Sequence, residues 1–173
     1  MTQSIVLAGF GGQGILFAGK VLAEMGMAMG KKVSWLPSYG PEMRGGTANC
    51  NVIISDDEVG SPIVNNPDIL VCMNKPSLMK FWKDAKKGGF IFVDSSLVDE
   101  EIECDDVVVI KVPATMMHAG ANLVMLGKMI KETAMATLEQ LKEGLKRAIP
   151  AKKQDMLEEN LRAIRLGWEI DDS

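Results

Sequence analysis

A glycine-rich segment near the start of the sequence has the residue types and the spacing of a phosphate-binding loop. The segment Gly9-Phe10-Gly11-Gly12-Gln13-Gly14 fits the pattern Gly-x-Gly-x-x-Gly, follows a short apolar run and precedes a helical pattern. Glycines allow positive φ and close approach of a ligand to the backbone, and free N–H groups at a helix start attract anions. The Gln13 side chain adds an amide that can donate or accept a hydrogen bond. This segment is therefore a candidate site for a phosphate-bearing ligand.

The same pattern leaves the identity of that ligand open. A dinucleotide site also needs an acidic residue at the end of the second strand, where it holds the ribose. The predicted second strand continues as Leu36-Pro37-Ser38, and the next acid, Glu42, lies within the following loop. We therefore favour a phosphate-bearing ligand other than NAD. The alternative interpretation is a tight turn that serves only the packing of the helix against the strand.

A second candidate loop covers residues 37–46 and contains two prolines and three glycines. Such a composition predicts a stiff loop that presents a few fixed polar side chains. The guanidinium of Arg44 suits a phosphate or a carboxylate, and Tyr39 offers a flat amphipathic surface. Glu42 can hold either Arg44 or a cation of a partner protein. A purely structural pair of Glu42 and Arg44 on the surface is the alternative.

Alternating strand and helix patterns must position these two loops. Short apolar runs predict strands at residues 4–9, 32–36, 51–55, 68–73, 90–94 and 107–112. Helical spacing and capping signals predict helices at residues 14–29, 76–87, 113–131, 138–149 and from about 152 onward. The alternation predicts an α/β fold, a Rossmann-like single domain over residues 1–173 with a mostly parallel sheet flanked by helices. Ligands in such folds bind outside the carboxyl ends of the strands, so both loops are expected there.

Composition and charge exclude several classes of protein. The chain has 173 residues, of which 47% are hydrophobic and 24% charged, as in an ordinary soluble domain, and no apolar run approaches the ~18 residues that span a bilayer. A membrane is therefore not expected as a partner, and a formal net charge of -4, which gives no overall attraction to phosphate backbones, makes a nucleic acid an unexpected partner as well. The first residues lack the basic flank and cleavage site of a secretory signal, which predicts a cytoplasmic protein.

The other reactive residues form no catalytic or metal-binding motif. Cys50, Cys72 and Cys104 are odd in number and widely separated, so we expect buried thiols rather than disulfides or cluster ligands. His118 is the only histidine and is expected to have a structural role, with a proton carrier as the alternative. Asp94 ends a predicted strand, where it can face the ligand crevice or cap the backbone that follows. We assign no catalytic residue and no metal ligand.

The two loops together resemble a known family. Gly-Phe-Gly-Gly-Gln-Gly-Ile at residues 9–15, then a helix and Ser-Tyr-Gly-Pro-Glu-Met-Arg-Gly-Gly at residues 38–46, resemble the gamma subunits of 2-oxoacid:ferredoxin oxidoreductases. The resemblance continues in the Pro-Asp strand start at 65–70, the Gly-Gly strand at 88–94 and the Asn-containing helix at 121–127. The resemblance thus covers most of the chain, up to about Lys131.

This resemblance implies an enzyme subunit that takes part in the oxidative decarboxylation of a 2-oxoacid to an acyl-coenzyme A, with ferredoxin as electron acceptor. The Ser-Tyr-Gly-Pro-Glu form is closer to gamma chains that act on 2-oxoglutarate or branched 2-oxoacids than to those that act on pyruvate. Thiamine diphosphate, Mg and iron–sulfur clusters are implied on partner subunits, namely alpha, beta and in some enzymes a ferredoxin-like delta chain. Coenzyme A is the co-substrate associated with the gamma domain.

The resemblance also assigns roles to residues. Gly11, Gly12, Gln13 and Gly14 are expected to contact coenzyme A through the backbone, and Arg44 is expected to contact its phosphate or a neighbouring subunit. The further candidate contacts are Ser38, Tyr39, Gly45, Gly46 and Asn122.

Two other functions remain open on the sequence. One is a free-standing NAD- or flavin-binding Rossmann oxidoreductase, which the missing ribose acid and the shortness of the chain disfavour. The other is a non-catalytic assembly module whose loops contact only protein. The isolated chain is also expected to homodimerise through apolar surface that partners would otherwise cover.

Overall fold

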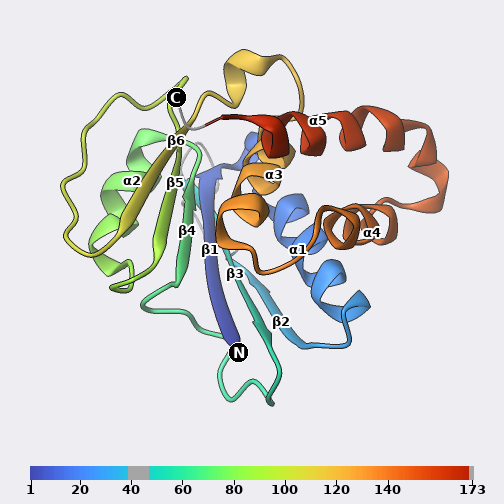
Figure 1. Cartoon of the computed structure of the whole chain (residues 1–173), viewed down its shortest axis with the longest axis horizontal. Helices are drawn as coiled ribbons and strands as arrows, with labels where there is room; N and C mark the ends of the chain where they lie inside the picture. The colour runs from blue at the N-terminus through green and yellow to red at the C-terminus, as the bar shows by residue number, and fades with distance from the viewer. Residues whose placement is uncertain (39–46, 172–173) are drawn as a thin grey trace.

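A six-stranded sheet forms the centre of the computed structural model, which describes residues 1–38 and 47–171. Its strands are β1 (Thr2–Phe10), β2 (Lys32–Pro37), β3 (Thr47–Ser55), β4 (Ile69–Cys72), β5 (Phe90–Asp94) and β6 (Val108–Val112). They lie in the order β2-β3-β1-β4-β5-β6 (Figure 1). β3 is antiparallel to both of its neighbours, and the pairs β1–β4, β4–β5 and β5–β6 are parallel. The expectation of a mostly parallel sheet is confirmed, with β3 inserted between β1 and β2.

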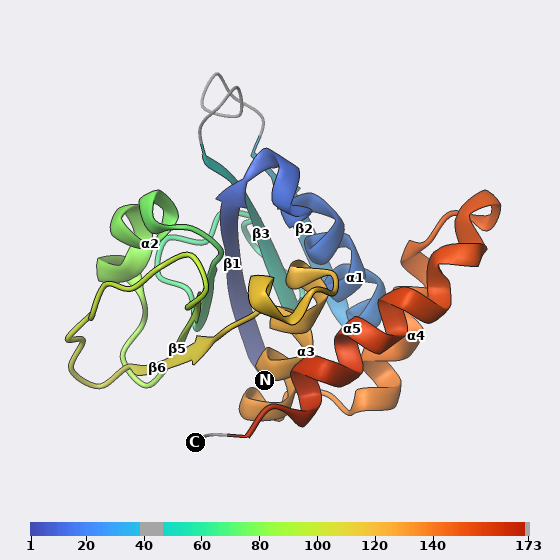
Figure 2. The same ribbon diagram turned by 90° about the horizontal axis from the view of Figure 1, so that it is seen from above.

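Helices cover both faces of this sheet, as expected for an α/β fold. They are α1 (Ile15–Ala28), α2 (Lys75–Phe81), α3 (Ala121–Thr133), α4 (Leu138–Ala148) and α5 (Leu157–Glu169). Figure 2 shows α2 on one side of the sheet and the other four helices on the opposite side. The side chains of β1 alternate between the two layers, because Ile5 and Leu7 join the larger core cluster and Val6 joins the smaller one. Burial on both faces explains why this strand is a continuous apolar run.

Two predicted helices are shorter than the sequence pattern indicated. The stretch predicted at 113–131 is divided: Thr115–Met117 forms a 3-10 turn, His118 has φ 54°, and α3 begins only after Gly120. The helix predicted through residue 87 ends at Phe81 and continues only as a 3-10 turn to Asp84. Apolar spacing continues across these turns, so periodicity alone did not reveal the breaks.

The last two helices follow the sequence signals more closely. Thr137 and Gln140 form the predicted capping box of α4, with the Thr137 side chain accepting a hydrogen bond from the Gln140 N–H. Residues Ala151–Met156 form a 3-10 segment rather than the start of the predicted final helix, and Lys153 departs from helical geometry within it. The regular helix α5 starts at Leu157.

Helices α3 and α5 cross with their backbones in direct contact. A Cβ atom at Gly127 would lie 2.2 Å from the Ile164 carbonyl oxygen, and one at Gly167 would lie 1.9 Å from the Val124 carbonyl oxygen. Only glycine therefore permits this approach at either position. The contact fixes α5 and the turn before it against α3.

The cysteines only partly follow the sequence expectation. Cys50 and Cys72 are buried, whereas Cys104 is partly exposed. Burial raises the pKa of the Cys50 thiol to about 12 and raises the pKa of Cys72 as well. Both buried thiols are therefore neutral and unreactive at physiological pH. Over residues 1–38 and 47–171, no helix has the length and apolarity needed to cross a membrane.

Candidate functional site

The first glycine loop joins β1 to α1 in the way that its pattern predicted. β1 ends at Phe10, residues Gly11–Gln13 form a 3-10 turn, and Gly14 connects this turn to α1. Gly14 has φ 73°, a left-handed conformation that glycine adopts without steric cost. A Cβ atom at Gly12 would meet no atom within 4 Å. The backbone of Gly12 is therefore open to a ligand, and packing within the chain does not require glycine at this position.

The side chain of Gln13 connects the ends of two neighbouring strands. Its Oε1 accepts a hydrogen bond from the Phe10 N–H at 2.7 Å, and its Nε2 donates to the Met73 carbonyl at 2.9 Å. Asn74 Nδ2 donates to the same Oε1 at 3.4 Å. The amide thus ties the carboxyl end of β1 to the chain that follows β4. Because both of its polar atoms are occupied in this way, Gln13 can offer a ligand mainly its backbone.

The start of α3 lies against the same loop. Asn122 Nδ2 donates a hydrogen bond of 3.0 Å to the carbonyl oxygen of Gly14. Helices α1 and α3 both begin after a glycine, Gly14 and Gly120, and neither has a side-chain cap or an acidic residue in its first turn. The first N–H groups of a helix have no partner within the helix and carry a partial positive charge. Two helix starts with anion-binding character therefore lie side by side.

A cleft of about 400 Å³ opens where these two helix starts meet. It lies at the carboxyl ends of the parallel strands, the edge at which the fold predicts ligand binding. Its lining residues are Gly12, Gln13, Gly14, Met73, Leu97, Thr115, Gly120, Ala121 and Asn122.

Asp94 supports one wall of this cleft instead of facing a ligand. Its carboxylate is fully buried and accepts hydrogen bonds from the Thr115 hydroxyl at 2.6 Å and from the Ser96 N–H at 3.1 Å. Of the two roles left open on the sequence, the hydrogen bonds favour backbone capping. His118 is exposed and ends the 3-10 turn that contains Thr115. The imidazole forms no hydrogen bond or ion pair in the part of the chain that the structure describes.

The structure brings together some of the predicted contact residues and separates others. Gly12, Gln13, Gly14 and Asn122 line the cleft, although Asn122 is 108 residues from Gly14. Gly11 is exposed beside the cleft without lining it. The predicted residues Tyr39, Arg44, Gly45 and Gly46 lie outside the described residues.

Ser38 is not part of the cleft. Its N–H donates to the Asn49 carbonyl at 2.8 Å, at the end of β2. Because β3 lies between β2 and β1, two strand spacings, about 10 Å, separate this position from β1. The end of β2 is also where a dinucleotide site would place its ribose acid, so the insertion of β3 moves that position away from the glycine loop.

Apart from Asn122, the second wall of the cleft was not predicted from the sequence. Met73, Leu97, Thr115 and Gly120 line it without having been predicted. The available signal was Gly120, a glycine before a helical pattern, but the prediction of one continuous helix over 113–131 concealed the helix start. Among the described residues, no three His, Cys, Asp or Glu side chains are grouped so that they could hold a metal ion.

The fold defines a Rossmann-like α/β domain, with a cleft between two helix starts at the carboxyl edge of its sheet. Residues 4–170 match the family profile of pyruvate ferredoxin/flavodoxin oxidoreductases, and the chain belongs to this family.

Individual relatives are similar in sequence over most of the length of this chain. It is 35% identical over 179 residues to the 2-oxoglutarate synthase subunit KorC of Methanocaldococcus jannaschii, covering 98% of this chain and 94% of that protein. It is 40% identical over 174 residues to the ketoisovalerate oxidoreductase subunit VorA of Methanothermobacter thermautotrophicus, covering 95% of this chain. The matched region spans only 35% of the length of the VorA subunit.

A solved structure has the same fold over nearly the whole chain. It is the gamma subunit of a keto/oxoacid ferredoxin oxidoreductase from Geobacter sulfurreducens. The TM-score is 0.80 at 30% sequence identity, and the match covers 96% of each chain. Fold, glycine loop and family therefore agree with the resemblance noted in the sequence.

Proposed function

We propose that this chain is the gamma subunit of a 2-oxoacid:ferredoxin oxidoreductase. In this proposal it acts with alpha and beta chains, and in some assemblies a ferredoxin-like delta chain, to convert a 2-oxoacid to an acyl-coenzyme A and to pass electrons to ferredoxin. Family membership and the likeness to the Geobacter sulfurreducens gamma subunit support the assignment. The chain would work as one domain, residues 1–173, in the cytoplasm.

The contribution proposed for this chain is to bind coenzyme A in the cleft between α1 and α3. The observation that carries this proposal is the convergence of two uncapped helix starts, held together by the hydrogen bond from Asn122 to Gly14. A pyrophosphate placed there would accept hydrogen bonds from free backbone N–H groups and would face the positive ends of two helix dipoles. The open backbone at Gly12 lets the phosphates approach closely.

The chemical steps themselves are assigned to partner subunits. Thiamine diphosphate with its Mg ion would supply the decarboxylation chemistry, and iron–sulfur clusters would accept the electrons. The residues described here offer no grouped metal ligands, and the two buried thiols are neutral at physiological pH. Residues of this chain would therefore bind and orient coenzyme A so that its thiol reaches a site formed elsewhere.

We propose 2-oxoglutarate as the first substrate to test. The form of residues 38–42 resembles gamma chains acting on 2-oxoglutarate or branched 2-oxoacids, and the relatives include proteins named for 2-oxoglutarate and for ketoisovalerate. Both acids should be compared, since substrate selection is expected to occur around the thiamine on partner subunits.

The subunit assignment can be tested by co-expressing this chain with the products of its neighbouring genes and purifying the assembly. Dye reduction that depends on a 2-oxoacid and on coenzyme A should require the presence of this chain. An assembly that lacks the chain and retains full coenzyme-A-dependent activity would contradict the proposed function.

The cleft assignment needs a change that disturbs the ligand without disturbing the fold. Gly12→Val adds a side chain where nothing lies within 4 Å, and Gly60→Val makes the same change in an equally open position outside the cleft. We expect Gly12→Val to raise the KM for coenzyme A by about tenfold or more, the loss of roughly one charge-assisted hydrogen bond. Gly60→Val should leave it unchanged. Equal KM values for the two variants would exclude Gly12 as a contact.

A further inference from the structure

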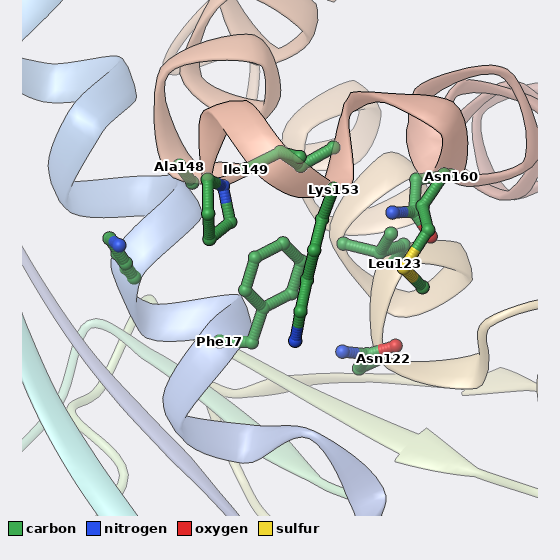
Figure 3. A pocket seen from close by; sticks show the side chains of 10 residues that line it. Phe17, Asn122, Leu123, Ala148, Ile149, Lys153 and Asn160 are labelled. Carbon is green, nitrogen blue, oxygen red and sulfur yellow. The ribbon is translucent and has the colours of Figure 1, made fainter.

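A second cavity adjoins the cleft on the helical side of the molecule. Its volume is about 300 Å³, and it lies between α1, α3, the end of α4, the 3-10 segment before α5 and the first turn of α5 (Figure 3). Asn122 lines both this cavity and the cleft. The two spaces therefore meet at the residue that joins α3 to the glycine loop.

The lining of this second cavity combines apolar walls with two cations. Phe17, Leu123, Ile149, Pro150 and Met156 supply the larger apolar surfaces. Lys20 and Lys153 also line it, and within residues 1–38 and 47–171 neither ammonium group has an ion pair or hydrogen-bond partner. The described lining contains no acidic residue. Two unpaired cations beside an apolar pocket, in a chain of net charge -4, favour an anionic ligand with a flat apolar part.

A turn with defined hydrogen bonds positions Lys153. The Lys153 N–H donates to the Pro150 carbonyl at 2.8 Å, and Gln154 Nε2 donates to the Ile149 carbonyl at 3.0 Å. Lys153 itself has φ -118° and ψ 21°, so the 3-10 segment bends at this residue. In Figure 3 the Lys153 side chain runs beside the Phe17 ring toward the side of the pocket where Asn122 lies. The ammonium group is thus directed into the pocket, next to an aromatic face.

We infer that this second cavity binds the nucleoside end of the cleft's ligand and that Lys20 and Lys153 recognise a phosphate on its ribose. This inference rests on the proposed function, because it takes the pyrophosphate to lie between α1 and α3. The Phe17 ring offers a stacking surface for a base, and lysine ammonium groups bind phosphate as point charges. The chain therefore selects a 3′-phosphorylated adenine nucleotide over one without that phosphate.

Calorimetric titration of the purified full chain with coenzyme A and with dephospho-coenzyme A tests this selection. The two probes differ only in the 3′-phosphate. We expect coenzyme A to bind about tenfold more tightly, the difference made by one charge-assisted contact. In Lys153→Met the preference should fall by severalfold, with affinity for dephospho-coenzyme A unchanged, and Lys20→Met should act in the same direction. Lys152→Met is the matched control, because Lys152 is exposed on the same turn but does not line the cavity.

The outcomes separate this inference from the proposed function. Equal affinity of the wild-type chain for the two probes would overturn the inference and leave coenzyme A binding in the cleft intact. If the double variant Lys20→Met, Lys153→Met still prefers coenzyme A over dephospho-coenzyme A, the inference is also overturned, because other residues must then recognise the 3′-phosphate. If neither probe binds, the proposed coenzyme A binding by this chain and the inference both fail, whereas the subunit assignment is tested separately by the co-expression experiment.

Discussion

The side-chain amide of Asn122 donates a 3.0 Å hydrogen bond to the backbone carbonyl of Gly14, 108 residues earlier in the chain. The same carbonyl also accepts the first helical hydrogen bond of α1, from the Ala18 N–H at 3.0 Å. This pair therefore holds the starts of α1 and α3 together and sets the width of the cleft between them. It also marks the boundary between the cleft and the second cavity.

Asn122→Ala should weaken coenzyme A binding more than it weakens the fold. We expect a loss of about 1 kcal/mol in the free energy of unfolding, the net value of one hydrogen bond, and roughly tenfold weaker binding as the two helix starts separate. Asn66→Ala is a matched control, since Asn66 also donates a side-chain hydrogen bond to a backbone carbonyl, that of Asp84 at 3.1 Å, away from the cleft. Urea unfolding and calorimetric titration measure the two quantities. An equal loss of affinity in both variants would contradict this role of Asn122.

Gly14→Ala should cost more stability than Gly30→Ala. Both glycines have nearly the same positive φ, 73° and 75°, so both substitutions carry the left-handed penalty of about 1 kcal/mol. Gly30 has open space around it, whereas a Cβ atom at Gly14 would lie 2.5 Å from Asn122 Nδ2. The difference, about 1 kcal/mol in urea unfolding, should disappear when the pair is compared in an Asn122→Ala background. A difference that persists there would assign the cost to another contact.

Gly167→Ala should destabilise the chain, although alanine normally stabilises a helix relative to glycine. In an open helix the change gains up to about 1 kcal/mol. Here the new Cβ atom would lie 1.9 Å from the Val124 carbonyl oxygen, so α3 and α5 must separate, which we expect to cost roughly 2 kcal/mol or more. Thermal unfolding of Gly167→Ala shows directly whether the substitution raises or lowers stability. A raised melting temperature would show that the helices do not cross at this distance.

Asp56 should make stability depend on pH below pH 4. Its carboxylate accepts a hydrogen bond from Lys31 and, at 2.7 Å, from the N-terminal ammonium, and these contacts lower its pKa from 3.8 to about 2. The stabilisation is complete above pH 3.8 and is lost as the pH falls through 2, because the unfolded chain takes up the proton first. Asp56→Asn should therefore lose less stability between pH 4 and pH 2 than the native chain does.

Asp57→Asn is the control for this acid dependence. Asp57 adjoins Asp56, and its carboxylate forms no ion pair within the described ranges. Urea unfolding at pH 4, 3 and 2 should therefore give Asp57→Asn the same slope as the native chain. Because the Asp56 ion pairs are exposed, salt should reduce the effect. The same slope in Asp56→Asn as in the native chain would contradict the assignment.

Local sequence signals determined much of the secondary structure of this protein. Apolar runs defined the buried strands, and the Thr137 capping box defined the start of α4, because these signals depend on interactions within a few residues. The spacing of Gly9 to Gly14 likewise located the glycine loop between a strand and a helix. Sequence alone therefore established the α/β class and one wall of the cleft.

Only the tertiary structure decided how the remaining parts meet. It inserted β3 between β1 and β2, and it placed the second helix start, at Gly120, beside Gly14. It also paired the buried carboxylate of Asp94 with the hydroxyl of Thr115, one of the residues that line the cleft. Each outcome depends on contacts between residues more than ten positions apart, and local periodicity carries no information about such contacts. The second cavity around Phe17 and Lys153 exists for the same reason, since residues from five helical segments, α1, α3, α4, the 3-10 segment and α5, line it.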